Sequence, residues 1–282
     1  MKLLVFVEPT SRGEWAITLT QDLALGLRGT VMLLTTNEIL AEDPQILDRT
    51  AEKFSGIAGL SLEKRVRPGP ARDAIVEESR ESRPAITIVP PAGRKGLARW
   101  IKGSRVKDVV HNAPSTVMVA RKPVSEHIRS ILVTISGGPM SETTALGACE
   151  IAQAIHAQLT VLHVTSSVTI PFGESSSTPT PRDITHIRDL LTRNGVEPRM
   201  RLREGMVVNE ILHECEAGGY DLLILGQHLV DMDAGGPFSE NIAEVIAIQC
   251  SIPVLVIRPR RWFEDASPGQ QAEAPTCGKL SS

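Results

Sequence analysis

The sequence LLVFVE at Leu3–Glu8 has a counterpart at Ile131–Ser136, which reads ILVTIS. Both segments are short apolar runs that end in a polar residue. Four more pairs of segments match in the same order: Val31–Thr35 with Thr160–Val164, Gly69–Ile75 with Gly205–Ile211, Ala85–Val89 with Asp221–Leu225, and Thr116–Arg121 with Pro253–Arg258. Five ordered matches at a slowly drifting spacing indicate that the chain contains two copies of one unit.

Each copy alternates short apolar runs with amphipathic stretches. The runs are rich in Val, Ile and Leu, which is typical of strands buried on both faces of a parallel sheet. The amphipathic stretches predict helices at Ala16–Leu27, Arg72–Ser82, Thr144–Ala157 and Val208–Ala217. The alternation predicts an α/β fold of two tandem doubly wound, Rossmann-like domains, each with a five-stranded parallel sheet flanked by helices.

We expect the two domains to span residues 1–122 and 128–260. Pro123 and Ser125 interrupt the pattern in the predicted join, Lys122–His127. The segment Pro171–Asp183 is rich in Pro, Ser and Thr and predicts a flexible excursion. Residues 261–282 are polar with Pro and Gly, which predicts a disordered tail.

Composition argues against several classes of protein. The chain of 282 residues carries 30 basic and 33 acidic side chains, for a net charge of -3, whereas a general nucleic-acid binder usually has a basic excess. No apolar run approaches the roughly 18 residues of a membrane helix, and the run after Met1 is too short for a signal peptide. Four scattered cysteines without a CxxC pair predict buried core residues in a reducing compartment. We therefore expect a cytoplasmic protein that binds neither nucleic acid nor membrane.

The loop after the fourth strand of the first copy carries a glycine pattern. Ligands of open parallel sheets bind beyond the carboxyl ends of the strands, which is where this loop lies. It reads VPPAGRKGLARWIKGSR from Val89 to Arg105, so that Gly93 is followed after nine residues by Gly103 and Ser104. Glycine lets a backbone approach a polyphosphate closely, and a helix that opens at Gly103-Ser104 would attract an anion.

This pattern resembles the universal stress protein family, whose nucleotide loop has the form G-x2-G-x9-G-[ST] between the fourth strand and the last helix. The resemblance spans residues 1–121 and 128–260 and includes the two final-strand segments. It implies that ATP, with Mg, is held by the glycines and the hydroxyl residue. It also implies that the two halves form a pseudo-dimer through their final strands. A homodimer of the whole chain is a further expectation.

In the first half the resemblance places the nucleotide site on Glu8, Thr35, Val89, Gly93, Gly103, Ser104 and Arg105. Glu8 matches the family's acidic residue after the first strand, and Thr35 lies where the family contacts adenine. Pro90 stands at the first glycine of the motif, where it supplies no amide N–H and cannot take a positive φ. We therefore expect the binding of ATP in this half to be weak.

The second half departs further from the motif. Gly226 keeps the first glycine, but Leu229 replaces the second, Ser239-Glu240 stands where Gly-Ser is expected, and Ser136 replaces the acidic residue. Ser136, Gly226 and Ser239 are thus the remains of a degenerate second site. Charge supports the contrast, because Arg94–Lys107 holds six basic residues and no acid, whereas Leu229–Ile246 holds four acids and no base. The sequence favours an anion or nucleotide site in half one and a structural copy in half two.

The predicted function is that of a stress-response regulatory protein and not of a dedicated enzyme. The sequence contains no G-x-S-x-G elbow, no H-E-x-x-H motif and no plausible triad, so we assign no catalytic or metal-binding residue and expect at most slow hydrolysis of ATP. His163 is assigned a structural role. Two alternatives stay open: a scaffold that binds an unknown protein partner without nucleotide, and a nucleotide-hydrolysing enzyme of the adenine-nucleotide α-hydrolase-like group.

Overall fold

The computed structural model describes residues 1–91, 105–136, 139–165, 181–227 and 242–258. In the first half the elements are β1 (Lys2–Phe6), α1 (Ser11–Leu27), β2 (Thr30–Thr36), α2 (Asn37–Glu42), α3 (Ile46–Glu52), β3 (Ser61–Arg67), α4 (Ala71–Ser82), β4 (Ile86–Val89), α5 (Arg105–Asn112) and β5 (Thr116–Val119). In the second half they are β6 (Ser130–Ile135), α6 (Pro139–Ala154), β7 (Gln158–Thr165), α7 (Pro181–Arg193), β8 (Arg199–Glu204), α8 (Val207–Ala217), β9 (Leu222–Gly226), α9 (Ile242–Gln249) and β10 (Val254–Ile257). Residues 171–180 of the predicted flexible excursion lie outside the described residues, but Pro181–Asp183 begin α7, so the prediction is wrong for these three residues. The predicted tail lies wholly outside the described residues.

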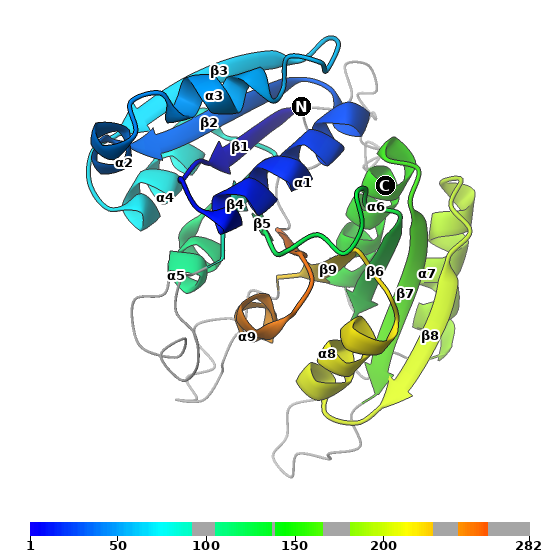
Figure 1. Ribbon diagram of the computed structural model, residues 1–282. Coiled ribbons are helices and arrows are strands. Elements are labelled where there is room, and N and C mark those ends of the chain that lie inside the picture. The colour runs from blue at the N-terminus through cyan, green and yellow to red at the C-terminus, as the bar shows by residue number, and fades with distance from the viewer. Residues whose placement is uncertain (92–104, 137–138, 166–180, 228–241, 259–282) are drawn as a thin grey trace, which may run out of the picture.

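The strands form one continuous sheet in the order β3-β2-β1-β4-β5-β10-β9-β6-β7-β8. Each half contributes five parallel strands, which confirms the predicted fold class. The halves meet where β5 pairs antiparallel with β10, so the final strands join them as expected (Figure 1). Helices α1, α3, α6 and α7 contribute to the buried cluster on one face, and α4, α5, α8 and α9 to that on the other. Both clusters contain residues of both halves, so the apolar core is shared.

Helix ends follow local chemistry that the periodicity did not capture. Helix α1 begins five residues before the predicted Ala16, because the hydroxyl of Thr10 caps it by accepting from the amide of Gly13 at 3.0 Å. Helix α6 begins at Pro139 and ends at Ala154, not at Ala157, and His156 just beyond it takes a φ of 56°. The predicted helices α4 and α8 differ from the observed ones by one residue at their starts.

One segment match of the sequence analysis is wrong by one residue. In the sheet, Leu3 pairs with Val31 and Ile131 pairs with Leu159. The segment Val31–Thr35 therefore corresponds to Leu159–His163 and not to Thr160–Val164. The apolar runs of both strands are longer than the segments compared, so composition alone did not fix their register.

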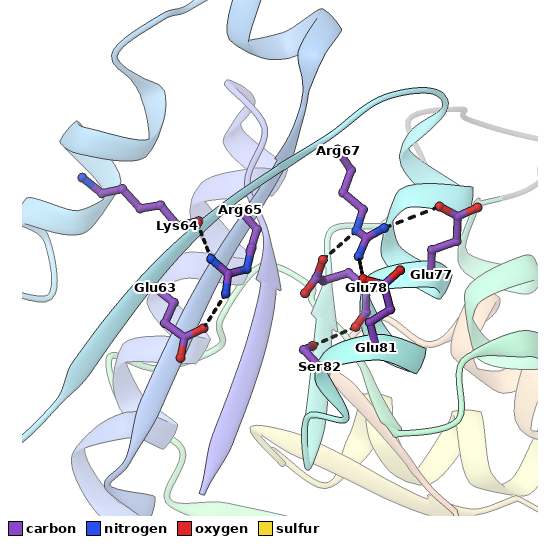
Figure 2. Close-up of polar contacts among 8 residues, drawn as sticks. All are labelled: Glu63, Lys64, Arg65, Arg67, Glu77, Glu78, Glu81 and Ser82. Carbon is purple, nitrogen blue, oxygen red and sulfur yellow. Dashed lines mark hydrogen bonds and ion pairs between the residues drawn. The ribbon is translucent and has the colours of Figure 1, made fainter.

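Both halves carry the same ion pair between the edge strand and the helix that follows it. Arg67 at the end of β3 donates from Nε to Glu78 of α4 at 2.6 Å, and Glu77 and Glu81 of the same helix also face its guanidinium (Figure 2). In the second half Arg203 at β8 donates to Glu214 of α8 at 2.6 Å. Glu78 and Glu214 are both buried. The repeated pair ties the edge strand of each half to the following helix.

We expect the pair in the second half to make stability sensitive to acid. Burial alone would raise the pKa of Glu214, but hydrogen bonds from Arg203 and Tyr220 outweigh it and hold the pKa below the ordinary 4.5. A lowered pKa in the folded chain contributes stability above the unfolded value, and this contribution is lost as the pH falls through the folded value. The test is urea denaturation at pH 7 and at pH 3.5. From the higher to the lower pH, the free energy of unfolding should therefore fall less for Glu214→Gln than for the unaltered chain. Glu216→Gln on the exposed face of the same helix is the matched control, and an equal acid loss in all three chains would contradict the assignment.

At the junction of the halves, one arginine from each half caps the last helix of the other half. Arg121, after β5, is buried and donates to the carbonyl oxygens of Ala247 at 2.6 Å and Cys250 at 3.1 Å, at the end of α9. Arg258, after β10, donates to the carbonyl oxygens of Val110 and His111 at 2.6 Å each, at the end of α5. Cations at the end of a helix satisfy its last carbonyls and its dipole. Each half therefore completes a helix of the other.

The predicted join is held from both sides. On the side of the first half, Nδ1 of His127 lies 2.7 Å from Oδ1 of Asp22 in α1, and the following amide of Ile128 donates to Asp22 Oδ2 at 2.7 Å. Asp221, just before β9, accepts from the amides of Arg129 and Ser130 at 2.9 Å each, and from the hydroxyl of Ser125. The connection between the halves is thus bonded to the domain on each side of it.

Candidate functional site

The candidate site of the first half lies where β1 and β4 end side by side. These neighbouring strands belong to crossovers that leave in opposite directions, which is the switch point where open α/β sheets bind ligands. Glu8 follows β1, Pro90 follows β4, and Arg105 is the first residue of α5. Tertiary structure therefore brings three positions of the predicted motif region together.

Glu8 and Arg105 form an ion pair at this switch point. Arg105 donates from Nη1 to Glu8 Oε2 at 2.7 Å and from Nη2 to the carbonyl oxygen of Pro90 at 3.4 Å. Its guanidinium carbon lies 5.3 Å from the centre of the buried Phe6 ring, at a distance typical of a cation–π contact. Both residues belong to the predicted nucleotide site, but nothing in their spacing along the chain indicates that they bind each other.

Thr10 fixes the other side of Glu8. Its hydroxyl donates to Glu8 Oε1 at 2.9 Å while accepting from the amide of Gly13. Beside Glu8, residues of α1 and α3 surround an open pocket of about 430 Å³, into which Val7, Ile17 and Ile46 contribute apolar surface. Thr10 is not among the predicted site residues, although a threonine directly before a helical pattern is a recognisable cap signal.

Thr35 and Val89, two residues of the predicted site, are buried and form hydrogen bonds that connect neighbouring strands and their ends. Thr35 has no exposed surface, and its hydroxyl donates to the carbonyl oxygen of Val7 at 3.0 Å. Val89 is also fully buried, and its carbonyl oxygen accepts from the amide of Ala120 at 2.8 Å. The predicted residues Gly93, Gly103 and Ser104 lie outside the described residues.

The corresponding edge of the second half is built differently. The amide of Ser136, at the place of Glu8, donates to the hydroxyl of Ser141 at 3.2 Å. Gly226 packs against α6, and a Cβ there would lie 2.3 Å from Thr144 Oγ1, so packing by itself requires this glycine. The ends of α5 and α9 match, since the amides of Ala113 and Cys250 donate to the carbonyl oxygens of Val109 and Ile246. Counted back from these ends, Ile242 holds the place of Arg105, so neither member of the ion pair has a charged counterpart. Ser239 lies outside the described residues.

His163 occupies in the second half the position of Thr35 in the first. Its Nδ1 lies 3.0 Å from the carbonyl oxygen of Ile135, as the Thr35 hydroxyl bonds that of Val7. The imidazole is 1% exposed. This agrees with the structural role assigned from the sequence.

The three cysteines that the structure describes are core residues, as predicted. Cys149, Cys215 and Cys250 are unpaired and buried, while Cys277 falls outside the described residues. Burial raises the pKa of the Cys149 thiol, which disfavours the reactive thiolate. Within the described ranges, no group of His, Cys, Asp and Glu could hold a metal ion, and no helix is long and apolar enough to span a membrane.

Comparison with known proteins decides the family. The sequence model of the universal stress protein family matches twice, over residues 2–121 and 127–258. The chain belongs to the universal stress protein family. It is a tandem member, because the two matches together cover most of its length. No curated protein matches the chain.

Solved structures show the same fold at low sequence identity. A universal stress protein from Archaeoglobus fulgidus superposes with a TM-score of 0.71 at 14% identity, with 91% of this chain and 96% of that chain covered. A functionally unknown protein from Pseudomonas aeruginosa superposes with a TM-score of 0.67 at 18% identity, with 92% of each chain covered. A family member from Arabidopsis thaliana, solved with AMP bound, covers 43% of this chain and 90% of its own, with a TM-score of 0.34 at 18% identity.

Proposed function

We propose that this universal stress protein is a cytoplasmic regulatory protein that binds an adenine nucleotide weakly in its first half. The observation that carries the proposal is the pair of charged side chains, Glu8 and Arg105, at the switch point of that half, which the described residues of the second half lack. Ser136 and Ile242 at the corresponding positions of the second half support its assignment as a structural copy. The domains are proposed to span residues 1–122 and 128–260.

The ligand class follows from the chemistry of the site and of the sequence around it. Six basic residues within Arg94–Lys107 favour an anion. The glycines Gly93 and Gly103 and the hydroxyl of Ser104 match the family motif for a nucleotide phosphate chain. We propose ATP, carried with Mg, as the first nucleotide to test and AMP as the second. Hydrolysis is proposed to be slow at most.

Titration calorimetry with Mg-ATP tests this proposal. We expect one site per chain, lost in Gly103→Val because a branched side chain would block close approach of the backbone to phosphate. Gly235→Val, in the corresponding loop of the second half, is the matched control and should leave binding unchanged. Binding that survives Gly103→Val, or that is lost only in Gly235→Val, would contradict a site in the first half.

A second candidate function is a scaffold that binds a protein partner without nucleotide. Two observations favour it: Pro90 offers no amide N–H, and Glu8 already has an internal partner in Arg105. It predicts no heat and no thermal stabilisation at millimolar ATP or AMP. It also predicts that Gly103→Val leaves partner binding intact.

A further inference from the structure

The guanidinium of Arg105 is largely buried, and one of its N–H donors has no acceptor among the described residues. Its side chain is 19% exposed and that of Glu8 is 12% exposed. Nη1 is bound to Glu8, whereas Nε is buried and has no hydrogen-bond partner among the residues that the structure describes. A buried donor without an acceptor costs free energy, so the site lacks one hydrogen-bond acceptor.

The fold does not need this ion pair. In the second half, the corresponding positions carry Ser136 and Ile242, and the strands follow one another in the same order. Burying two opposite charges contributes little net stability compared with apolar packing. An ion pair that the fold can do without, and that the described part of the second half lacks, points to a role in binding.

We propose that Glu8 is an internal competitor for Arg105, which a phosphate-bearing anion displaces. The proposal rests on the ligand site proposed above for the first half and names how that site is controlled. A phosphate group presents several acceptor oxygens and suits the fork of an arginine, so it can use the Nε donor that Glu8 leaves idle. The displaced carboxylate can keep its bond to Thr10 and face the open pocket beside it.

This competition sets the affinity of the first half for anions. As long as the carboxylate occupies Arg105, only the fraction of molecules with an open pair can accept a phosphate, and the apparent affinity falls by that fraction. Arg105 thus selects phosphate-bearing ligands, and Glu8 determines how tightly such a ligand must bind Arg105 in order to displace the carboxylate.

The test is titration of the full chain with inorganic pyrophosphate at fixed ionic strength. Glu8→Gln keeps the shape of the side chain but removes its charge, so pyrophosphate should bind about tenfold more tightly than to the unaltered chain. Adding Arg105→Met to Glu8→Gln should abolish this gain. Asp48→Asn removes an exposed carboxylate of α3 that is paired with Lys64 and lies outside the pocket, and this matched control should leave the affinity unchanged.

Equal or weaker binding to Glu8→Gln would overturn the proposal, since Glu8 would then be a ligand contact or a bystander. If Glu8→Gln does not fold, the Nε–H resonance of Arg105 in the unaltered chain decides, assigned by its loss in Arg105→Lys. Pyrophosphate should shift that resonance, and a resonance that stays fixed at millimolar pyrophosphate overturns the proposal.

The two proposals fail separately. If Glu8→Gln gains pyrophosphate affinity but no chain binds ATP or AMP, the nucleotide proposal fails and the competition stands. If ATP binds the unaltered chain and Glu8→Gln gains affinity for neither ligand, the nucleotide site stands and the competition is overturned.

Discussion

Replacing Arg121 by methionine should lower the free energy of unfolding by about 3 kcal/mol. Arg121 is 6% exposed and donates to three carbonyl oxygens at the end of α9, those of Ala247, Ile248 and Cys250. Methionine fills similar space but leaves these acceptors buried without a donor and removes the positive charge that faces the helix dipole. Because α9 belongs to the other half, the loss should weaken the junction as well as the helix.

Urea denaturation followed by circular dichroism measures this effect. Lys122→Met changes the neighbouring exposed residue in the same way and should shift the free energy of unfolding by no more than about 0.5 kcal/mol. A loss below about 1 kcal/mol for Arg121→Met would mean that water can replace the cap. It would then be wrong to regard the two halves as completing each other's helices.

The second large effect is expected for Gly26→Ala in α1. In an exposed helix this change usually stabilises by about 1 kcal/mol, because alanine has the higher helix propensity. Here a Cβ would lie 2.3 Å from the carbonyl oxygen of Ala154 in α6 of the other half. Backbone cannot move aside as a flexible side chain can, so α1 and α6 would have to separate. We expect the free energy of unfolding to fall by about 2 kcal/mol.

Gly56→Ala is the matched control, because no atom lies within 4 Å of a Cβ built there. It should leave the melting temperature nearly unchanged, whereas Gly26→Ala should lower it by several degrees. A higher melting temperature for Gly26→Ala would falsify close packing of the two halves at this point.

The candidate site was predictable in its parts but not in its assembly. The motif named Glu8 and Arg105 separately, since one follows the first strand and the other follows the Gly103-Ser104 pair. Nothing in their spacing indicated that the two charges neutralise each other, because 97 positions separate them in the chain. For Gly226 the motif suggested approach to a ligand, whereas the structure shows a packing requirement set by Thr144.

The sequence by itself determined the duplicated α/β unit, the parallel strands and the family. These follow from local periodicity and from the order of matched segments, which need no knowledge of distant contacts. Tertiary structure alone decided that the final strands pair antiparallel within one continuous sheet, that Arg121 and Arg258 cap the opposite halves, and that Arg105 is bound by Glu8. The physical reason is that hydrogen bonds and ion pairs between distant residues depend on distances of a few ångströms, which only the folded chain sets.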